Sequence, residues 1–237
     1  MSAPQRSSCS IIQMACTAVL ALLVGVAPAC ALTEAELRKF FEFGEGKLSL
    51  TSRIPSWPKQ DLAYGITGGL SRGAGPMIED YMKRVSTVTG LNIHPGGKMD
   101  ITFIVDETVL LDLHDKPQRF HTIGLPDNFI ALTQAAIPRP PAPGGETCAS
   151  QASKGPDGDI HYAIALSQTA SKTCIVPATL TVIGVSMHSL DDESKAFHMA
   201  CILYQGRKIG ARTMSEILDK DAQLESMCAA LEQTNGR

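Results

Sequence analysis

The first long hydrophobic segment of the chain lies near its amino terminus, where residues 11–26 are apolar with few interruptions. The residues before it carry a single charged side chain, Arg6, and the small-residue sequence Ala29-Cys30-Ala31 follows it. A basic start, an apolar run and alanines around a cleavage position are the pattern of an export signal. We therefore predict that residues 1–31 are a signal peptide, and that the mature protein is periplasmic or secreted.

Two alternatives remain open for this segment. An apolar run of this length approaches a short transmembrane helix, although Pro28 and the Ala-x-Ala sequence favour cleavage. Cys30 could instead carry a lipid, but residues 27–29 lack the Leu or Val that such a site normally has. No later apolar stretch is long enough to span a membrane, so we expect no stable membrane span after cleavage.

In the first half of the remaining chain, the hydrophobic pattern predicts alternating helices and strands. Thr33 and Glu36 have the spacing of a capping box, so a short helix should begin there. Pro76 stands where a helix favours its first residue and Gly90 where one usually ends, so a longer helix should lie between them. The other elements predicted here are strands at 61–67 and 99–105 and helices at 109–113 and 127–136.

The second half begins with a proline-rich segment at 137–145, which cannot be a helix or an interior strand and should form a surface loop. Residues 159–166 and 180–187 are predicted as neighbouring strands, the second because it is rich in β-branched residues. From Asp191 onward, apolar stripes predict C-terminal helices. The pattern therefore predicts one α+β domain at 32–237, with a mixed sheet of four to five strands packed against helices.

Charge excludes one class of partner. The chain has 237 residues and a formal net charge of −3, and removal of residues 1–31, whose only charged side chain is Arg6, would make this −4. No block of basic residues could follow a phosphate backbone. We therefore expect no nucleic-acid partner.

Four cysteines follow the predicted signal: Cys148, Cys174, Cys201 and Cys228. An even number of cysteines in an exported chain indicates disulfide bonds. Three pairings are possible, and sequence neighbours favour Cys148 with Cys174 and Cys201 with Cys228. Each bridge would contribute roughly 3 kcal/mol to stability. A zinc site built from these thiols is the alternative, although no Cys-x-x-Cys spacing is present.

A glycine-rich segment at 68–75 lies between a predicted strand and a predicted helix, a place where backbone amides and a helix dipole can bind an anion. The segment lacks both the Gly-x-Gly-x-x-Gly fingerprint and the Gly-Lys-Ser/Thr ending of a P-loop. A flexible connector is therefore the competing interpretation. The candidate ligand residues are Gly69, Arg72, Gly73 and Gly75.

Catalytic and metal-binding motifs are weak in this sequence. His188 and His198 flank an acidic run at 191–193, so a metal site can be drawn there, but acids before a helix also stabilise its amino end. Cys201 lies one turn after His198 and could act as a nucleophile only if it were free of a disulfide. The adjacent acids at 106–107 fit either a carboxylate pair or a helix cap. We expect no cofactor.

The order of several short motifs is familiar. Trp57 precedes a strand, a helix ends in Thr-Gly-Leu at 89–91, a strand follows at 101–105, and residues 181–185 precede a helix that carries Cys201. This order resembles a family of exported bacterial proteins of unknown function that is related to matrixin-type metallopeptidases. The resemblance implies a zincin-like fold. Where a working zincin has His-Glu on that helix, residues 201–208 have neither a zinc ligand nor a general base.

Together these patterns predict an exported, disulfide-stabilised envelope protein with a non-catalytic binding or interaction role. Its partner would be a protein or a small molecule in the envelope, and a small ligand could lie beside residues 68–75. The alternative is a metal-assisted, peptidase-like hydrolase that uses His188, His198 and nearby acids.

Overall fold

A computed structural model describes residues 32–41, 48–96, 99–136, 148–187 and 189–235. The predicted signal peptide, the proline-rich segment at 137–145 and His188 lie outside these residues. Within the described part of the chain, no helix is long and apolar enough to span a membrane.

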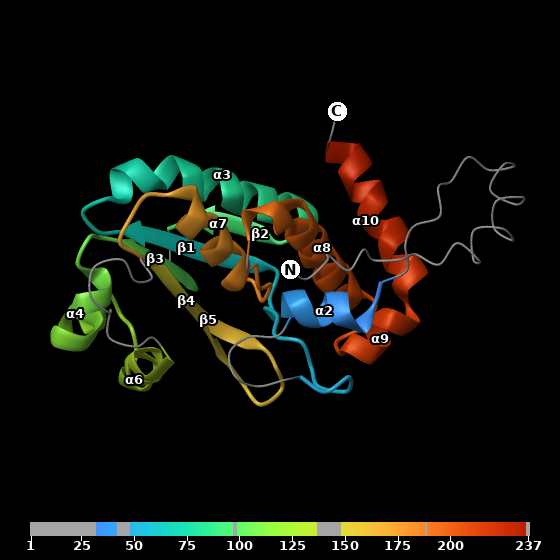
Figure 1. The fold of residues 1–237 in the computed structure, drawn as a ribbon, viewed down its shortest axis with the longest axis horizontal. Coiled ribbons are helices and arrows are strands. Elements are labelled where there is room, and N and C mark those ends of the chain that lie inside the picture. Colours follow the sequence, from blue (N-terminus) through green and yellow to red (C-terminus); the bar gives the residue numbers. More distant parts are fainter. Residues whose placement is uncertain (1–31, 42–47, 97–98, 137–147, 188, 236–237) are drawn as a thin grey trace, which may run out of the picture. The chain divides into compact units, whose positions relative to one another are not determined.

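A five-stranded mixed sheet in the order β2-β1-β3-β5-β4 organises the described residues (Figure 1). Neighbouring strands are parallel except for β4, which runs antiparallel to β5 at one edge. The predicted α+β class with a mixed sheet is therefore confirmed. The strands are β1 (Asp61–Thr67), β2 (Asn92–Pro95), β3 (Ile101–Val105), β4 (Cys148–Lys154) and β5 (Ile160–Ser167).

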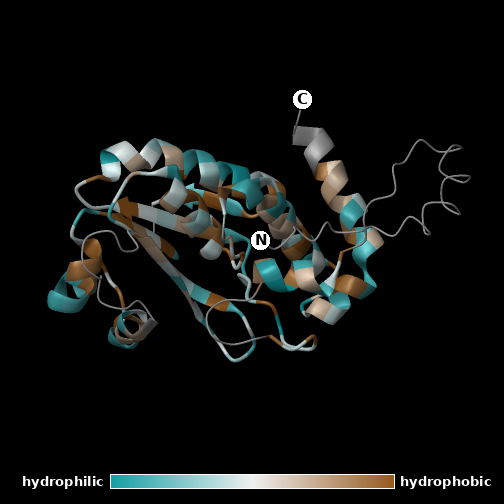
Figure 2. Cartoon of the chain, viewed as in Figure 1, coloured by the Kyte–Doolittle hydropathy of each residue, from teal (hydrophilic) through white to brown (hydrophobic). Residues whose placement is uncertain are grey.

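Helices cover both faces of the sheet, so the central strand β3 is buried along its whole length. Helices α3, α7 and α8 pack on one face around the larger core, and α4, α5 and α6 pack on the other around a smaller one. Figure 2 shows hydrophobic residues on the strands and hydrophilic residues along much of α3. The helices are α2 (Glu34–Phe41), α3 (Ser71–Thr89), α4 (Val109–Asp115), α5 (Gln118–Thr122), α6 (Asp127–Ala136), α7 (Lys172–Thr181), α8 (Glu193–Lys208), α9 (Met214–Asp219) and α10 (Asp221–Asn235).

Two disulfide bonds connect elements of the larger core. Cys148 at the start of β4 is bonded to Cys174 on α7, and Cys201 on α8 is bonded to Cys228 on α10. The paired Cα atoms are 5.5 and 5.9 Å apart. This is the pairing that sequence order favours.

The predicted strand at 180–187 is wrong. Residues 180 and 181 end α7, and a buried turn follows in which Gly184 has a φ of 93°. Helix α7 contacts β4, β5, α3 and α8, so its residues are apolar on nearly every side and show no helical period. The missing period hides α7 in the sequence, and the buried turn at 182–187, which is rich in β-branched residues, has the composition of a strand.

The predicted helix start at Pro76 is also wrong, because α3 begins at Ser71. Gly73 and Gly75 have low helix propensity and conceal the first turns in the sequence. Pro76 lies inside the helix and removes the hydrogen bond that its own N–H would donate to the carbonyl of Arg72. The predicted end at Gly90 is confirmed: this residue caps the helix with a φ of 72° and donates its N–H to Ser86.

Gly65 lets the chain pass from one side of β1 to the other. Strand β2 pairs with the first part of β1 and β3 pairs with the last part, on opposite edges. On the way to β3, the Met99 thioether occupies the space that a side chain at position 65 would need. Strands β2 and β3 therefore lie on opposite sides of β1 in the sheet.

Candidate functional site

The chain leaves the carboxyl ends of β1 and β3 on opposite faces of the sheet, and a crevice lies outside these two strand ends. The chain leaves β1 through α3, which lies on one face and leads to β2, whereas it leaves β3 through α4 and α5 on the other face. Open sheets with parallel strands bind ligands at such a reversal of strand order, outside the carboxyl ends of the strands. The fold itself therefore marks this crevice as the first candidate site.

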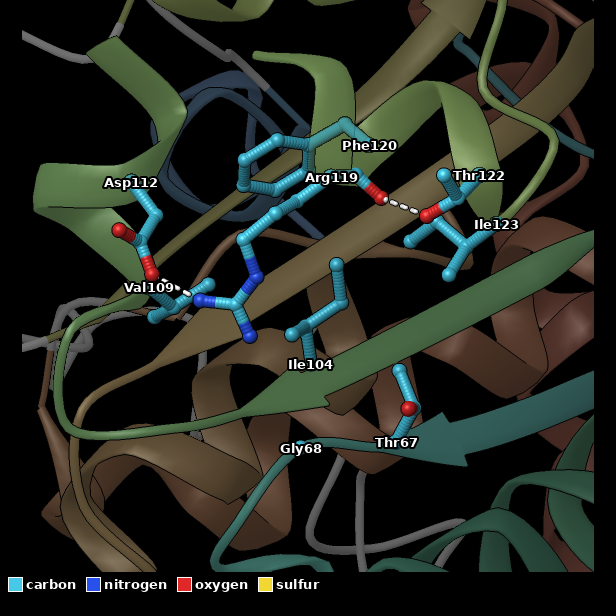
Figure 3. Close-up of a pocket in the computed structure, with 9 residues that line it drawn as sticks. All are labelled: Thr67, Gly68, Ile104, Val109, Asp112, Arg119, Phe120, Thr122 and Ile123. Carbon is cyan, nitrogen blue, oxygen red and sulfur yellow. Dashed lines mark hydrogen bonds and ion pairs between the residues drawn. The ribbon is translucent and has the colours of Figure 1, made fainter. Parts of the chain in front are cut away.

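The crevice encloses a cavity of about 170 Å³ between the strand ends and helices α4 and α5 (Figure 3). Thr67 and Gly68 come from the end of β1, and Ile104 comes from β3. The lining combines apolar side chains with hydroxyl, carboxylate and guanidinium groups. The remaining lining residues are Val109, Asp112, Arg119, Phe120, Thr122 and Ile123.

Arg119 extends from α5 across the cavity toward Asp112 on α4 (Figure 3). Its Nη1 donates to Oδ2 of Asp112, whose side chain is only 3% exposed. The same carboxylate accepts the Thr108 hydroxyl at 2.7 Å and pairs with the Lys116 ammonium at 2.9 Å. Asp112 is therefore a buried acceptor that fixes the direction of the guanidinium.

Asp106, the first residue after β3, holds the other side of this cluster. Its Oδ1 accepts the Thr108 N–H and hydroxyl at 3.1 and 3.0 Å, and its Oδ2 accepts the Gly69 N–H at 3.2 Å. Nη2 of Arg119 lies 3.5 Å from Oδ2 of Asp106. Asp106 thus joins the end of β1, the turn before α4 and Arg119.

Both carboxyls have lowered pKa values. Hydrogen bonding from the Thr108 backbone is the main cause that lowers the pKa of Asp106, and it outweighs desolvation. Burial alone would raise the pKa of Asp112, but the hydrogen bonds from Thr108 and Lys116 and the charges of Arg119 and Lys116 outweigh it. Both groups therefore stay ionised at neutral pH and act as hydrogen-bond acceptors.

The predicted ligand residues lie close to this crevice but do not line it. Gly69 donates its N–H to Asp106, so a carboxylate of the protein already occupies the position where an external anion would bind. Arg72, Gly73 and Gly75 belong to the first turns of α3, and the Arg72 side chain is exposed. Gly68 is the member of the glycine-rich segment that lines the cavity.

Of the two candidate metal residues, His198 alone lies in the described part of the chain. Nε2 of His198 lies 3.0 Å from a carboxylate oxygen of Glu225 on α10, and the other weak candidate, His188, is outside the described residues. No group of three His, Cys, Asp or Glu side chains suited to a metal occurs among the described residues. Cys201 is bonded to Cys228, so its thiol is not available as a nucleophile.

The sequence indicated Asp106 but not its partners. The capping interpretation fits Asp106, which accepts the Thr108 N–H just before α4. Asp112 and Arg119 lie seven positions apart, on two short helices joined at Pro117, so no helical spacing relates them. A lone acid in the otherwise apolar pattern of 109–113 was the available signal for Asp112.

Comparison with known proteins adds no name to this site. The chain matches no known family model and no curated protein sequence. The resemblance to exported proteins related to metallopeptidases therefore stays a prediction.

Proposed function

We propose that this chain is an exported, disulfide-stabilised protein that binds a small solute in the crevice at the carboxyl ends of β1 and β3 and performs no chemistry on it. Export is supported by the apolar segment and the Ala-x-Ala sequence at the amino terminus. The two disulfides add support, because such bonds persist mainly in oxidising compartments.

The observation that carries the binding role is the Arg119 guanidinium, held in the crevice by Asp112 and Asp106. A guanidinium has five N–H donors, and the two carboxylates leave some of them for a ligand. Because the protein fixes the side chain before binding, a ligand that pairs with it loses less conformational entropy on the protein side.

The charges and size of the crevice suggest the class of ligand. Arg119 is the only cation among the lining residues and Asp112 the only acid, so the wall favours a solute without a large net charge. A cavity of about 170 Å³ is smaller than the 300–1,000 Å³ typical of drug-sized sites. We infer a small zwitterion such as a free amino acid, with its carboxylate on Arg119 and its side chain against Phe120.

The lowered pKa values of Asp106 and Asp112 favour binding over proton transfer. A general acid or base works best with a pKa near the operating pH. A carboxylate that stays ionised is suited to hold Arg119 and to accept a ligand ammonium. The site therefore fits recognition better than acid–base catalysis.

Thermal unfolding with individual amino acids at millimolar concentration tests this proposal. We expect at least one amino acid to raise the melting temperature, since a ligand at ten times its Kd stabilises the folded state by about 1.4 kcal/mol. Arg119→Gln should abolish the shift, and Arg72→Gln, which changes an exposed cation outside the crevice, should keep it. No shift with any amino acid, or an equal shift in the Arg119→Gln variant, would contradict the proposal.

A further inference from the structure

A second cavity lies at the opposite end of the sheet, where β1 and β2 begin and where α3 and α8 end. Its volume is about 230 Å³. Four of its lining residues are basic, and the described part of the lining contains no Asp or Glu. The four are Lys59 before β1, Arg207 and Lys208 in the last turn of α8, and Arg212 after that helix.

Two of these cations are held in place by carboxylates outside the lining. Nζ of Lys59 lies 2.5 Å from Oδ1 of Asp100. Nη2 of Arg207 lies 2.7 Å from Oδ1 of Asp159, and its Nη1 donates to the Ser56 hydroxyl at 2.6 Å. The Arg207 side chain is only 14% exposed, so it forms a fixed wall of the cavity.

The other two cations have no carboxylate within ion-pair distance among the described residues. The Lys208 ammonium lies over Gly90, 2.7 Å from the place where a Cβ would stand. Glu216 is close to Arg212 in sequence, but its Oε2 accepts the backbone N–H groups of Arg212 and Thr213 in the cap of α9. Counted over the residues that the structure describes, the cavity lining therefore has an excess of positive charge.

Helix ends explain only part of this arrangement. The carboxyl ends of α3 and α8 carry partial negative charges, which basic residues in the last turn stabilise. That role accounts for Arg207 and Lys208 but not for Lys59 and Arg212, which lie outside both helices. Some of the terminal carbonyls are already bonded, since Gly206 accepts the N–H of Ala211.

We propose that this cavity binds a small soluble oxyanion, through a phosphate or a carboxylate group. A concave surface lined by one sign of charge concentrates the field and attracts the opposite charge. Two guanidinium groups and two ammonium groups supply N–H donors to oxyanion oxygens, and the arginines can do so through two parallel hydrogen bonds. The modest volume favours a small solute over a bulky one.

A tryptophan side chain in the cavity lining allows binding to be followed by fluorescence. Trp57 lines the cavity, and it is the only tryptophan in the chain. Its backbone N–H donates to the hydroxyl of Tyr204, which also lines the cavity. We expect titration of the purified protein with inorganic phosphate, and separately with citrate, to give saturable binding to at least one of them, by tryptophan fluorescence or by calorimetry.

The decisive variant is Lys208→Gln/Arg212→Gln, which removes the two cations that have no carboxylate partner within the described residues. Both side chains are exposed, so the variant should fold. We expect its Kd for the anion that binds to rise at least about tenfold, and the wild-type Kd to rise with salt as the charges are screened. Absence of wild-type binding to both anions at low salt, or equal affinity in the variant, would overturn the proposal.

A matched control removes two positive charges that lie outside the cavity. Arg72→Gln/Lys195→Gln changes exposed cations near the start of α3 and of α8, and it should leave the Kd unchanged. An equal loss in this control would show a non-specific charge effect and overturn the site. Binding to phosphatidylglycerol vesicles without binding to phosphate or citrate would overturn the proposal of a soluble ligand.

Discussion

The two ends of the sheet hold their positive charges in different ways. At the carboxyl end, Arg119 lies between two carboxylates, one of them buried, and the site is nearly neutral. At the amino end, Arg207 and Lys59 have carboxylate partners but Lys208 and Arg212 have none among the described residues. Basic side chains are therefore balanced by carboxylates at the carboxyl end. At the amino end they leave a positive potential that can attract an anion.

Burial explains the difference. A charge removed from water must be paired, and the 3% exposed carboxylate of Asp112 is paired with Arg119 and Lys116. Exposed cations such as Lys208 and Arg212 keep their hydration and need no partner. Changes at the carboxyl end should therefore affect folding as well as ligand binding, whereas changes at the amino end should affect binding with little effect on folding.

The largest expected effect comes from Gly68, where the backbone at the carboxyl end is most constrained. Its φ is 104°, and a Cβ there would collide with the carbonyl oxygen of Val105. Gly68→Ala should lower the free energy of unfolding by at least about 3 kcal/mol, measured by urea denaturation. Gly69→Ala, whose added Cβ would have Oδ2 of Asp106 as its nearest neighbour at 3.7 Å, is the control and should change it little. Equal effects would show that the backbone path at Gly68 is not restrictive.

The next effect is that of the buried carboxylate. Asp112→Asn removes the charge that pairs with Arg119, and because that guanidinium is half exposed we expect a loss of about 2 kcal/mol in the free energy of unfolding. Lys116→Gln removes the exposed partner of the same carboxylate and should cost less than about 0.5 kcal/mol. An Asp112→Asn variant with the wild-type free energy of unfolding would mean that the ion-pair cluster does not contribute to folding.

Lowering the pH should reduce the free energy of unfolding through the two carboxylates at the carboxyl end. Asp106 and Asp112 have lowered pKa values, so their contribution is present above the unfolded-state pKa of about 3.9 and is lost as pH falls through the lower folded-state values. Urea denaturation between neutral pH and pH of about 3 should show falling stability in the wild type, with a shallower fall in Asp112→Asn. The variant Lys208→Gln/Arg212→Gln should keep the wild-type slope. If the stability of Asp112→Asn fell with pH as steeply as that of the wild type, Asp112 would not be a source of the acid sensitivity.

The smallest effect on stability is expected at the amino end. Lys208→Gln/Arg212→Gln should change the free energy of unfolding by no more than about 0.5 kcal/mol, because exposed charges contribute little. A loss above 2 kcal/mol would mean that these cations belong to the framework, and the contrast between the two ends would fail.

Two elements were predicted with the bounds that the structure shows. Strand β1 at Asp61–Thr67 and helix α6 at Asp127–Ala136 have the predicted bounds. Strands β2 and β4 were missed because both lie at sheet edges, and β4 consists mainly of small and polar residues with weak strand propensity. Burial of α7 on nearly every side removed the periodicity on which a helix prediction depends.

The candidate sites were harder to predict because they are assembled from distant segments. Lys59 and Arg212 line one cavity although more than a hundred residues separate them in the sequence. Asp112 meets Arg119 only because the chain turns between α4 and α5. The disulfides are the exception, since the even cysteine count and the order of cysteines in the chain were enough to favour the observed pairing.

The most direct test of an exported, disulfide-stabilised protein is the intact mass of the protein recovered from its natural compartment, before and after reduction. We predict a chain that begins at Leu32, outside the cytoplasm, and gains the mass of four hydrogens on reduction because two disulfides open. An unprocessed cytoplasmic chain with four free thiols among Cys148, Cys174, Cys201 and Cys228 would contradict the account.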